Sequence, residues 1–205
     1  MQHPSDMWNA RYGEAEYVYG TEPNHYFATQ LAKLPAGRLL LPAEGEGRNA
    51  TFAASQGWQV EAFDQSSAGQ VKALRLAEAR DVHIDYQVAA FDEVAFAPAT
   101  FDAIGLIYAH FPADRKAAYH QRLATWLRPG GYVILEAFSK EQLRYQAFSN
   151  SGGPRDRDML FSVKEILQAF AGFDVLEAVE EEITLQEGRY HDGLASVVRF
   201  VGRRG

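Results

Sequence analysis

Short apolar runs alternate with amphipathic stretches along most of the chain. Five runs have the length and composition of buried or half-buried strands, at residues 38–41, 59–63, 84–88, 103–107 and 132–135. Apolar residues at helical spacing predict helices between them, over 49–56, 68–80 and 114–127. Strands that alternate with helices are typical of parallel crossovers, so the pattern predicts an α/β fold with a doubly wound, mostly parallel sheet.

The ends of the chain depart from this alternation. The first 30 or so residues are rich in aromatic side chains, which suits a lid or a segment packed against the sheet: Trp8, Tyr12, Tyr17, Tyr19, Tyr26 and Phe27. The third helix should end before residues 128–131, where a proline and two glycines follow. Further on, Ser162 and Glu165 have the spacing of a capping box that opens a helix. Residues 173–179 and 196–201 predict a terminal antiparallel pair.

Composition narrows the class of protein. The chain has 205 residues and a formal net charge of −7, and it lacks cysteine, which excludes disulfides, thiolate metal sites and a cysteine nucleophile. A net negative chain without basic runs indicates no nucleic-acid partner. No stretch approaches the roughly 18 apolar residues of a membrane span, and the start has no secretory signal pattern. We therefore expect a cytoplasmic protein, a monomer or weak dimer, with no membrane partner.

A glycine-containing turn follows the first predicted strand. Gly45, Gly47 and Ala50 satisfy the G-x-G-x-x-G/A pattern between a strand and a helix, where glycine lets backbone amides approach a ligand. Asp64 follows the second predicted strand, 19 residues after Gly45. A carboxylate at about this spacing binds ribose hydroxyls in dinucleotide-binding folds. The arrangement predicts a ligand that contains a nucleoside.

The charge of this turn discriminates between nucleoside cofactors. Glu44 and Glu46 lie where a dinucleotide would place its pyrophosphate, and the turn lacks the lysine of a P-loop. Carboxylates repel a phosphate but attract the sulfonium and ammonium of S-adenosylmethionine. The turn therefore favours S-adenosylmethionine over NAD. The alternative interpretation is that both glutamates point to water and the glycines only permit a tight turn.

These motifs carry a family resemblance that spans about Trp8 to Arg204. It includes the segments 8–12 and 17–23, the turn 44–50, Asp64, residues 101–104 and 127–132, and the stretch from Glu187 to Val198. The chain resembles class I S-adenosylmethionine-dependent methyltransferases, and it looks most like the small bacterial branch related to tellurite-resistance and thiopurine methyltransferases. One departure is Leu41, which stands where the superfamily usually has an acid.

The resemblance implies a Rossmann-like sheet of seven strands with an antiparallel last strand and helices on both faces. It also implies one domain over 1–205, with an N-terminal aromatic lid over 1–35, a nucleoside-binding core over 36–139 and C-terminal helices with a β-hairpin over 140–205. In this reading the turn cradles the methionine part, Asp64 holds the ribose, and residues 89–92 flank the adenine, with Phe91 either stacking on it or belonging to the core. The expected cofactor-binding residues are Tyr19, Ala43, Glu44, Gly45, Glu46, Gly47, Asn49, Asp64, Gln65, Ser66, Ala90, Phe91, Ile107 and Tyr108.

The segment after the fourth predicted strand is where an acceptor should meet the methyl group. His110 is a candidate base or anchor there, although it could instead fix the local backbone. Arg189 and His191, before the last strand, form a second polar pair able to reach the same place. We take His110 and His191 as candidate catalytic residues and Tyr17, Phe111 and Arg189 as candidate substrate-binding residues. No histidine has metal-motif spacing, so no metal is expected.

The expected activity is methyl transfer from S-adenosylmethionine to a small molecule such as a thiol or a chalcogen oxyanion. Two alternatives stay open. One is an NAD-dependent oxidoreductase, and the other is a nucleoside-binding or interaction module without turnover, which the leucine at position 41 suggests.

Overall fold

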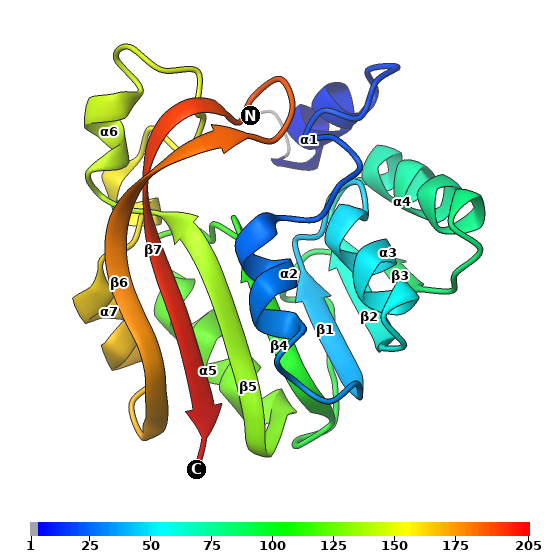
Figure 1. Cartoon of the computed structure of the whole chain (residues 1–205), viewed down its shortest axis with the longest axis vertical. Coiled ribbons are helices and arrows are strands. Elements are labelled where there is room, and N and C mark those ends of the chain that lie inside the picture. Colours follow the sequence, from blue (N-terminus) through cyan, green and yellow to red (C-terminus); the bar gives the residue numbers. More distant parts are fainter. Residues whose placement is uncertain (1–3) are drawn as a thin grey trace.

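A computed structural model describes residues 4–205, in which seven strands form one mixed sheet of order β3-β2-β1-β4-β5-β7-β6 (Figure 1). β7 is antiparallel to both of its neighbours, and the pairs among β1 to β5 are parallel. The predicted Rossmann-like fold with an antiparallel last strand is therefore confirmed. The strands are β1 Arg38–Pro42, β2 Gln59–Asp64, β3 Asp85–Val88, β4 Phe101–Ile107, β5 Leu127–Phe138, β6 Phe173–Gln186 and β7 Asp192–Arg204.

The helices agree with the periodicity of the sequence. The capping box at Ser162 and Glu165 is present at the start of the seventh helix, as predicted. Among residues 4–205, every helix is too short or too polar to cross a membrane. The helical segments are α1 Pro4–Tyr12, α2 His25–Leu31, α3 Arg48–Ser55, α4 Ser67–Ala79, α5 Lys116–Trp126, α6 Gln142–Tyr145, the 3-10 turn η1 Arg157–Met159 and α7 Val163–Ala169.

Two apolar layers cover the two faces of the sheet. Consecutive residues of a strand point to opposite faces, so Val133 packs in one cluster while Ile134 packs in the other. Side chains of α2, α3 and α4 complete the cluster around Ile134, and those of α5 and α7 complete the cluster around Val133. Burial on both faces explains why the central strands are almost continuously apolar.

Two boundaries differ from the sequence prediction. β5 begins at Leu127 rather than at Tyr132, while α5 ends before residues 128–131, as the proline and glycines indicated. The terminal pair is also longer than predicted, because β6 and β7 remain paired from Phe173 and Arg204 to Gln186 and Asp192. β6 is the outer strand of the sheet, and carboxylates at Glu180 to Glu182 are tolerated there.

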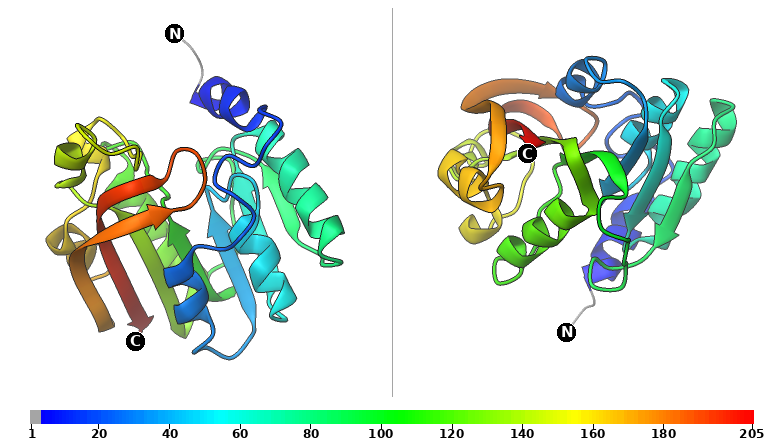
Figure 2. Two further views of the ribbon diagram at one scale, coloured as in Figure 1. Left: turned by 45° about the horizontal axis from the view of Figure 1, so that its top comes forward. Right: turned by 90° about the horizontal axis from the view of Figure 1, so that it is seen from below.

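Part of the aromatic N-terminal segment packs against the sheet, as its composition suggested, and its role as a lid stays a prediction. Tyr26 and Phe27 lie on α2 and pack against the sheet. α1 lies instead beside α4, and the tip of the β6–β7 hairpin approaches it (Figure 2). Two parts of the chain that flank the core in sequence therefore come together above the same edge of the sheet.

The order in which strands are added to the sheet reverses between β1 and β4. Both strands end at the same edge, and β2 and β3 lie on one side while β5 lies on the other. Ala43 follows β1 with φ 54° and Tyr108 follows β4 with φ 52°, a left-handed conformation that non-glycine residues adopt at a cost. Ligands bind beside such a switch point in open α/β sheets. The strained residues thus mark the expected binding edge.

Gly47 holds α3 against α4. It has φ 83°, and a β carbon added there would lie 2.5 Å from the Cβ of Ala73 on α4. Gly57 has a similar φ of 87° but has nothing within 4 Å of an added β carbon. A substitution at Gly57 therefore tests backbone strain alone, whereas a substitution at Gly47 tests backbone strain together with the packing of α3 on α4.

We expect Gly57→Ala to lower the free energy of unfolding by about 1–2 kcal/mol through left-handed strain alone. Gly47→Ala should lose about 1–3 kcal/mol more, because the methyl group overpacks the α3–α4 contact. Urea denaturation of both variants measures the difference. Equal losses would show that α4 does not constrain this turn.

Candidate cofactor and active site

Glu44 caps the first turn of α3. Its Oε1 accepts hydrogen bonds from the backbone amides of Asn49 at 2.9 Å and Ala50 at 2.8 Å. These are orphan donors that a helix N-terminus otherwise offers to an anion. Burial raises the pKa of Glu44 to about 7, against the opposing effect of those amides. Glu44 is therefore part of the protein's own hydrogen bonding and does not face water.

Glu46 is also bound internally. It forms a buried ion pair with Lys72 of α4 at 2.8 Å, and its second oxygen accepts the backbone amide of Val18 at 2.8 Å. Lys72 in turn donates to the carbonyl of Glu16. Glu46 therefore has donors from the chain at both oxygens, whereas Glu44 has them at Oε1, and the attraction of a cationic ligand by these glutamates stays a prediction. Glu46 ties the glycine turn to the N-terminal segment.

Asp64 lies at the end of β2 beside the same turn. Its carboxylate accepts the amides of Gly45 at 3.1 Å and Ser66 at 2.8 Å, and burial raises its pKa to about 6. Ser66 caps α4 and donates its hydroxyl to Asn9 of α1. Each oxygen of Asp64 accepts one of these two amides, so lone pairs remain for further donors such as ribose hydroxyls.

Leu41 and Gly45 show how packing shapes this turn. Leu41 is 1% exposed and belongs to the apolar core, so β1 supplies no carboxylate for an ammonium group. Glu44 does not replace it freely, because its Oε1 already caps α3. A β carbon at Gly45 would meet the hydroxyl of Tyr12 at 2.6 Å. Tyr12 therefore lies over the glycine turn, where its ring would cover a bound cofactor.

The adenine side of the expected site contains small residues. Gln65, Ala89 and Ala90 are half-buried after β2 and β3. Phe91 instead stacks on Tyr119 with ring centroids 4.0 Å apart and lies in the α5 core. Of the two roles considered for Phe91, the structure places its ring in the core.

The end of β4 brings aromatic and polar groups together. Tyr108 donates its hydroxyl to Glu136 of β5 at 2.9 Å, and its ring centroid lies 4.5 Å from that of His191. His191 is 6% exposed and its Nδ1 lies 3.6 Å from Glu187. Burial lowers the pKa of His191, against the opposing effect of Glu187. Ile107, just before Tyr108, is buried.

His110 has a defined proton position. Its Nδ1 lies 3.1 Å from the carbonyl of Met159, which only accepts, so Nδ1 carries the proton and Nε2 has a lone pair. No group among residues 4–205 satisfies Nε2. Burial lowers the pKa of His110 to about 4, which keeps this lone pair free. The rings of His110 and His191 both pack on Phe138.

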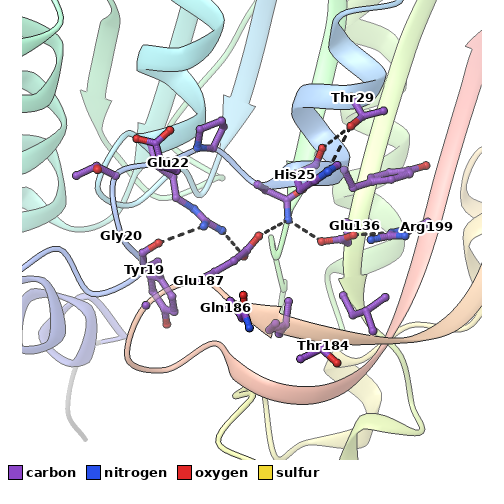
Figure 3. Close-up of a pocket in the computed structure, with 18 residues that line it drawn as sticks. Tyr19, Gly20, Glu22, His25, Thr29, Glu136, Thr184, Gln186, Glu187 and Arg199 are labelled. Carbon is purple, nitrogen blue, oxygen red and sulfur yellow. Dashed lines mark hydrogen bonds and ion pairs between the residues drawn. The ribbon is translucent and has the colours of Figure 1, made fainter.

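A pocket of about 720 Å³ lies beside this edge, between the segment around α2 and the β6–β7 hairpin (Figure 3). Its wall includes Arg48 at the start of α3 and Glu136 on β5, and Thr184, Gln186 and Glu187 come from the hairpin. Asp64, Tyr108 and His191 are not in its lining. The pocket is therefore adjacent to the expected cofactor edge rather than identical to it.

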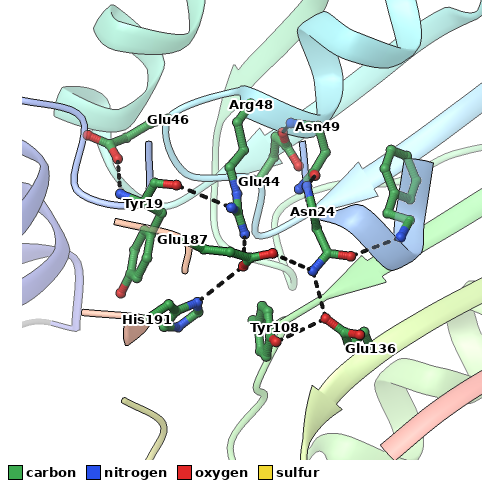
Figure 4. A network of polar contacts seen from close by, with 11 residues as sticks. Tyr19, Asn24, Glu44, Glu46, Arg48, Asn49, Tyr108, Glu136, Glu187 and His191 are labelled. Atoms are coloured by element: carbon green, nitrogen blue, oxygen red, sulfur yellow. Dashed lines mark hydrogen bonds and ion pairs between the residues drawn. The ribbon is translucent and has the colours of Figure 1, made fainter. Parts of the chain in front are cut away.

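A buried polar network separates the pocket from Tyr108 and His191 (Figure 4). Asn24 donates to Glu136 at 2.6 Å and to Glu187 at 2.9 Å. Arg48 pairs with Glu187 at 2.7 Å, and its own neighbour Asn49 accepts the backbone amide of Asn24 at 2.9 Å. Sequence reasoning missed Asn24, Arg48, Glu136 and Glu187 as site residues. The signal for Glu136 was a lone acid within an apolar strand.

The three candidate substrate-binding residues do not come together. Tyr17 donates to the carbonyl of Lys72 on α4, and Phe111 is buried in the α5 core. Arg189 is exposed and pairs with Glu14 at 3.0 Å. Tyr19 of the expected cofactor set lies closer to the candidate chemistry, since its ring centroid is 4.5 Å from that of His191.

Comparisons with known proteins agree with this arrangement. The methyltransferase-domain family matches residues 42–131, which run from the end of β1 to the middle of β5. No curated protein matches the sequence.

Three solved structures are similar in fold. One, from work on the conversion of a disulfide bond into a thioacetal group during echinomycin biosynthesis, has 20% identity and a TM-score of 0.77, covering 98% of this chain and 92% of that one. TehB from Haemophilus influenzae has 13% identity and a TM-score of 0.72, covering 98% and 67%. The 1,6-didemethyltoxoflavin-N1-methyltransferase of Burkholderia thailandensis, with bound 1,6-didemethyltoxoflavin and S-adenosylhomocysteine, has 20% identity and a TM-score of 0.61, covering 87% and 76%.

The methyltransferase-domain match and the fold confirm the recognition made from the motifs. The fold and this match, which covers less than half of the chain, support a class I S-adenosylmethionine-dependent methyltransferase. They likewise support an enzyme whose cofactor is S-adenosylmethionine.

We expect Glu44 to contribute a loss of stability as pH rises from about 4.5 to about 7. The pKa of Glu44 is raised from 4.5 to about 7, so the folded state binds more protons than the unfolded chain in this interval. The contribution is at most about 3 kcal/mol. Glu44→Gln should remove it, which the difference between two urea-denaturation series across this pH range measures.

Glu78→Gln, on the exposed face of α4, is the matched control and should leave the pH dependence unchanged. Asp64 contributes a decrease in the same direction in all three proteins and cancels in the comparison. If Glu44→Gln and wild type have parallel pH profiles, Glu44 is not the buried carboxylate responsible.

Proposed function

We propose that the enzyme transfers a methyl group from S-adenosylmethionine to a small-molecule acceptor at the edge formed by β1, β2 and β4. The observation that supports this best is the capping of α3 by Glu44. The amides of Asn49 and Ala50 are the donors that would receive a pyrophosphate, and a carboxylate of the chain already occupies them. A phosphate-free nucleoside needs no such donors, which disfavours the NAD-dependent alternative.

The residues around the turn fit a nucleoside. Asp64 is held by two amides and keeps lone pairs for ribose hydroxyls, while half-buried Ala89 and Ala90 leave the adjoining surface without bulky side chains. Tyr12 and Tyr19 cover the turn from the N-terminal side. In this proposal the 36–139 core holds the nucleoside, and the N-terminal segment with the hairpin shields it.

S-adenosylmethionine supplies an electrophilic methyl group on a sulfonium when bound. The chain then has to align an acceptor and exclude water, which together lower the barrier substantially. Tyr108 is oriented by its hydrogen bond to Glu136, and its ring contacts His191. A general base is required only for an acceptor that arrives protonated. The free Nε2 of His110 and the ring of His191, whose pKa burial lowers, are the groups proposed to take that proton.

Two classes of acceptor, a thiol and a chalcogen oxyanion, make different demands on the site. A thiol fits a neutral imidazole that accepts its proton, whereas a chalcogen oxyanion needs no base but requires a cation. The second candidate function is a nucleoside-binding module without turnover. The observation that favours it is the buried Leu41, because β1 then offers no acid to the ammonium of the cofactor.

Asp64→Asn should weaken binding of S-adenosylhomocysteine by about 1–3 kcal/mol, because the amide group loses the charge that ribose hydroxyls donate to. The variant keeps a carbonyl oxygen for only one of the amides of Gly45 and Ser66, so circular dichroism of the variant accompanies the titration to show that the fold persists. Isothermal calorimetry with S-adenosylhomocysteine measures the loss.

Asp85→Asn, exposed at the start of β3, is the control and should bind like wild type. Tight binding of NAD with no binding of S-adenosylhomocysteine would sink the proposal. Turnover of labelled methyl donor with any thiol, selenite, tellurite or phenol would exclude the inert module.

A further inference from the structure

Arg11, in the last turn of α1, has its charge held between aromatic rings. Its guanidinium carbon lies 5.0 Å from the ring centroid of Trp8 and 4.6 Å from that of Tyr190. Nη1 donates to the hydroxyl of Tyr19 at 2.9 Å. Aromatic faces stabilise a cation without neutralising it, and the remaining N–H donors of the fork stay available.

The other arginines around this edge each have a carboxylate. Arg48 pairs with Glu187, Arg199 with Glu136, and Arg189 with Glu14. Glu14 is the acid closest to Arg11 along the chain, yet its carboxylate receives Arg189 and the hydroxyl of Tyr190 instead. Within residues 4–205, no carboxylate forms an ion pair with Arg11.

Arg11 lies close to the proposed chemistry. Tyr19, which receives its hydrogen bond, contacts the ring of His191, and His191 contacts Tyr108. The charge of Arg11 is one of the influences that lower the pKa of His191, after burial. The next residue, Tyr12, reaches Gly45. An uncompensated cation is therefore placed beside both the cofactor turn and the end of β4.

We propose that Arg11 binds the oxyanion of a ligand, a carboxylate or a group of similar geometry, at this edge. The inference rests on the proposed function for the identity of that ligand. A guanidinium fork matches two oxygens of such a group, and the flanking rings of Trp8 and Tyr190 hold the fork in one orientation. Two sources share this chemistry: the carboxylate of the amino-acid tail of S-adenosylmethionine, and an oxyanion on the acceptor.

Calorimetry with S-adenosylmethionine and with its decarboxylated form separates these sources, because the two compounds differ only in the carboxylate. We expect Arg11→Met, which keeps an apolar stem between the rings, to weaken S-adenosylmethionine about 10- to 100-fold and to leave the decarboxylated form within twofold. Arg11→Lys should recover part of the loss. Arg144→Gln, an exposed arginine on α6, is the control and should change neither ligand.

A second titration uses selenite, on the protein alone and saturated with S-adenosylhomocysteine. If Arg11→Met abolishes selenite binding but leaves S-adenosylmethionine unchanged, the oxyanion belongs to the acceptor. Equal weakening of both nucleosides means that Arg11 acts by packing α1, which overturns the inference. It is also overturned if no ligand's affinity depends on Arg11. If wild type binds neither nucleoside, the proposed function fails, and the selenite titration on the protein alone still decides for or against Arg11.

Discussion

The interaction on which the site depends is the hydrogen bonding of one buried glutamate to the start of a helix. Glu44 satisfies two amides of α3 that would otherwise attract an anion. The turn after β1 is thereby closed to phosphate and held at one geometry. This arrangement requires the burial of a carboxylate, which is unfavourable and raises the pKa of Glu44. A dinucleotide fold can in this way serve a nucleoside without phosphates by filling its anion site from its own chain.

The segments outside the alternating core assemble the rest of the site. Asn24 precedes α2, Glu136 lies near the end of β5 and Glu187 lies on the hairpin, yet Asn24 donates to both acids. Arg48 adds the start of α3 to the same group. Buried charges are tolerated only when they are paired, and here each pair joins parts of the chain that are distant in sequence. The N-terminal segment and hairpin are consequently held over the edge where the cofactor turn ends.

Sequence patterns predicted those elements well whose conformation depends on neighbouring residues along the chain. The strands 38–41, 59–63 and 103–107 and the capping box at Ser162 follow from periodicity and from hydrogen bonds within a few residues. The early start of β5 was missed because proline and glycine indicate the end of a helix but not the start of a strand, whereas Leu127 already pairs with Phe101 of β4. The length of β6 was likewise set by pairing with β7.

The sequence by itself determined the class of fold, the place of the glycine turn and the acid after β2, because these depend on spacing along the chain. The partners of each charged side chain were decided only by the tertiary structure. Glu46 binds Lys72 of α4 and Phe91 stacks on Tyr119 of α5, and neither contact leaves a signal in local spacing. Arg11 is singled out by the same rule, since its lack of a carboxylate became visible only once Glu14 was seen to bind Arg189. Folding brings distant residues to within a few ångströms, and short-range electrostatics acts at that distance.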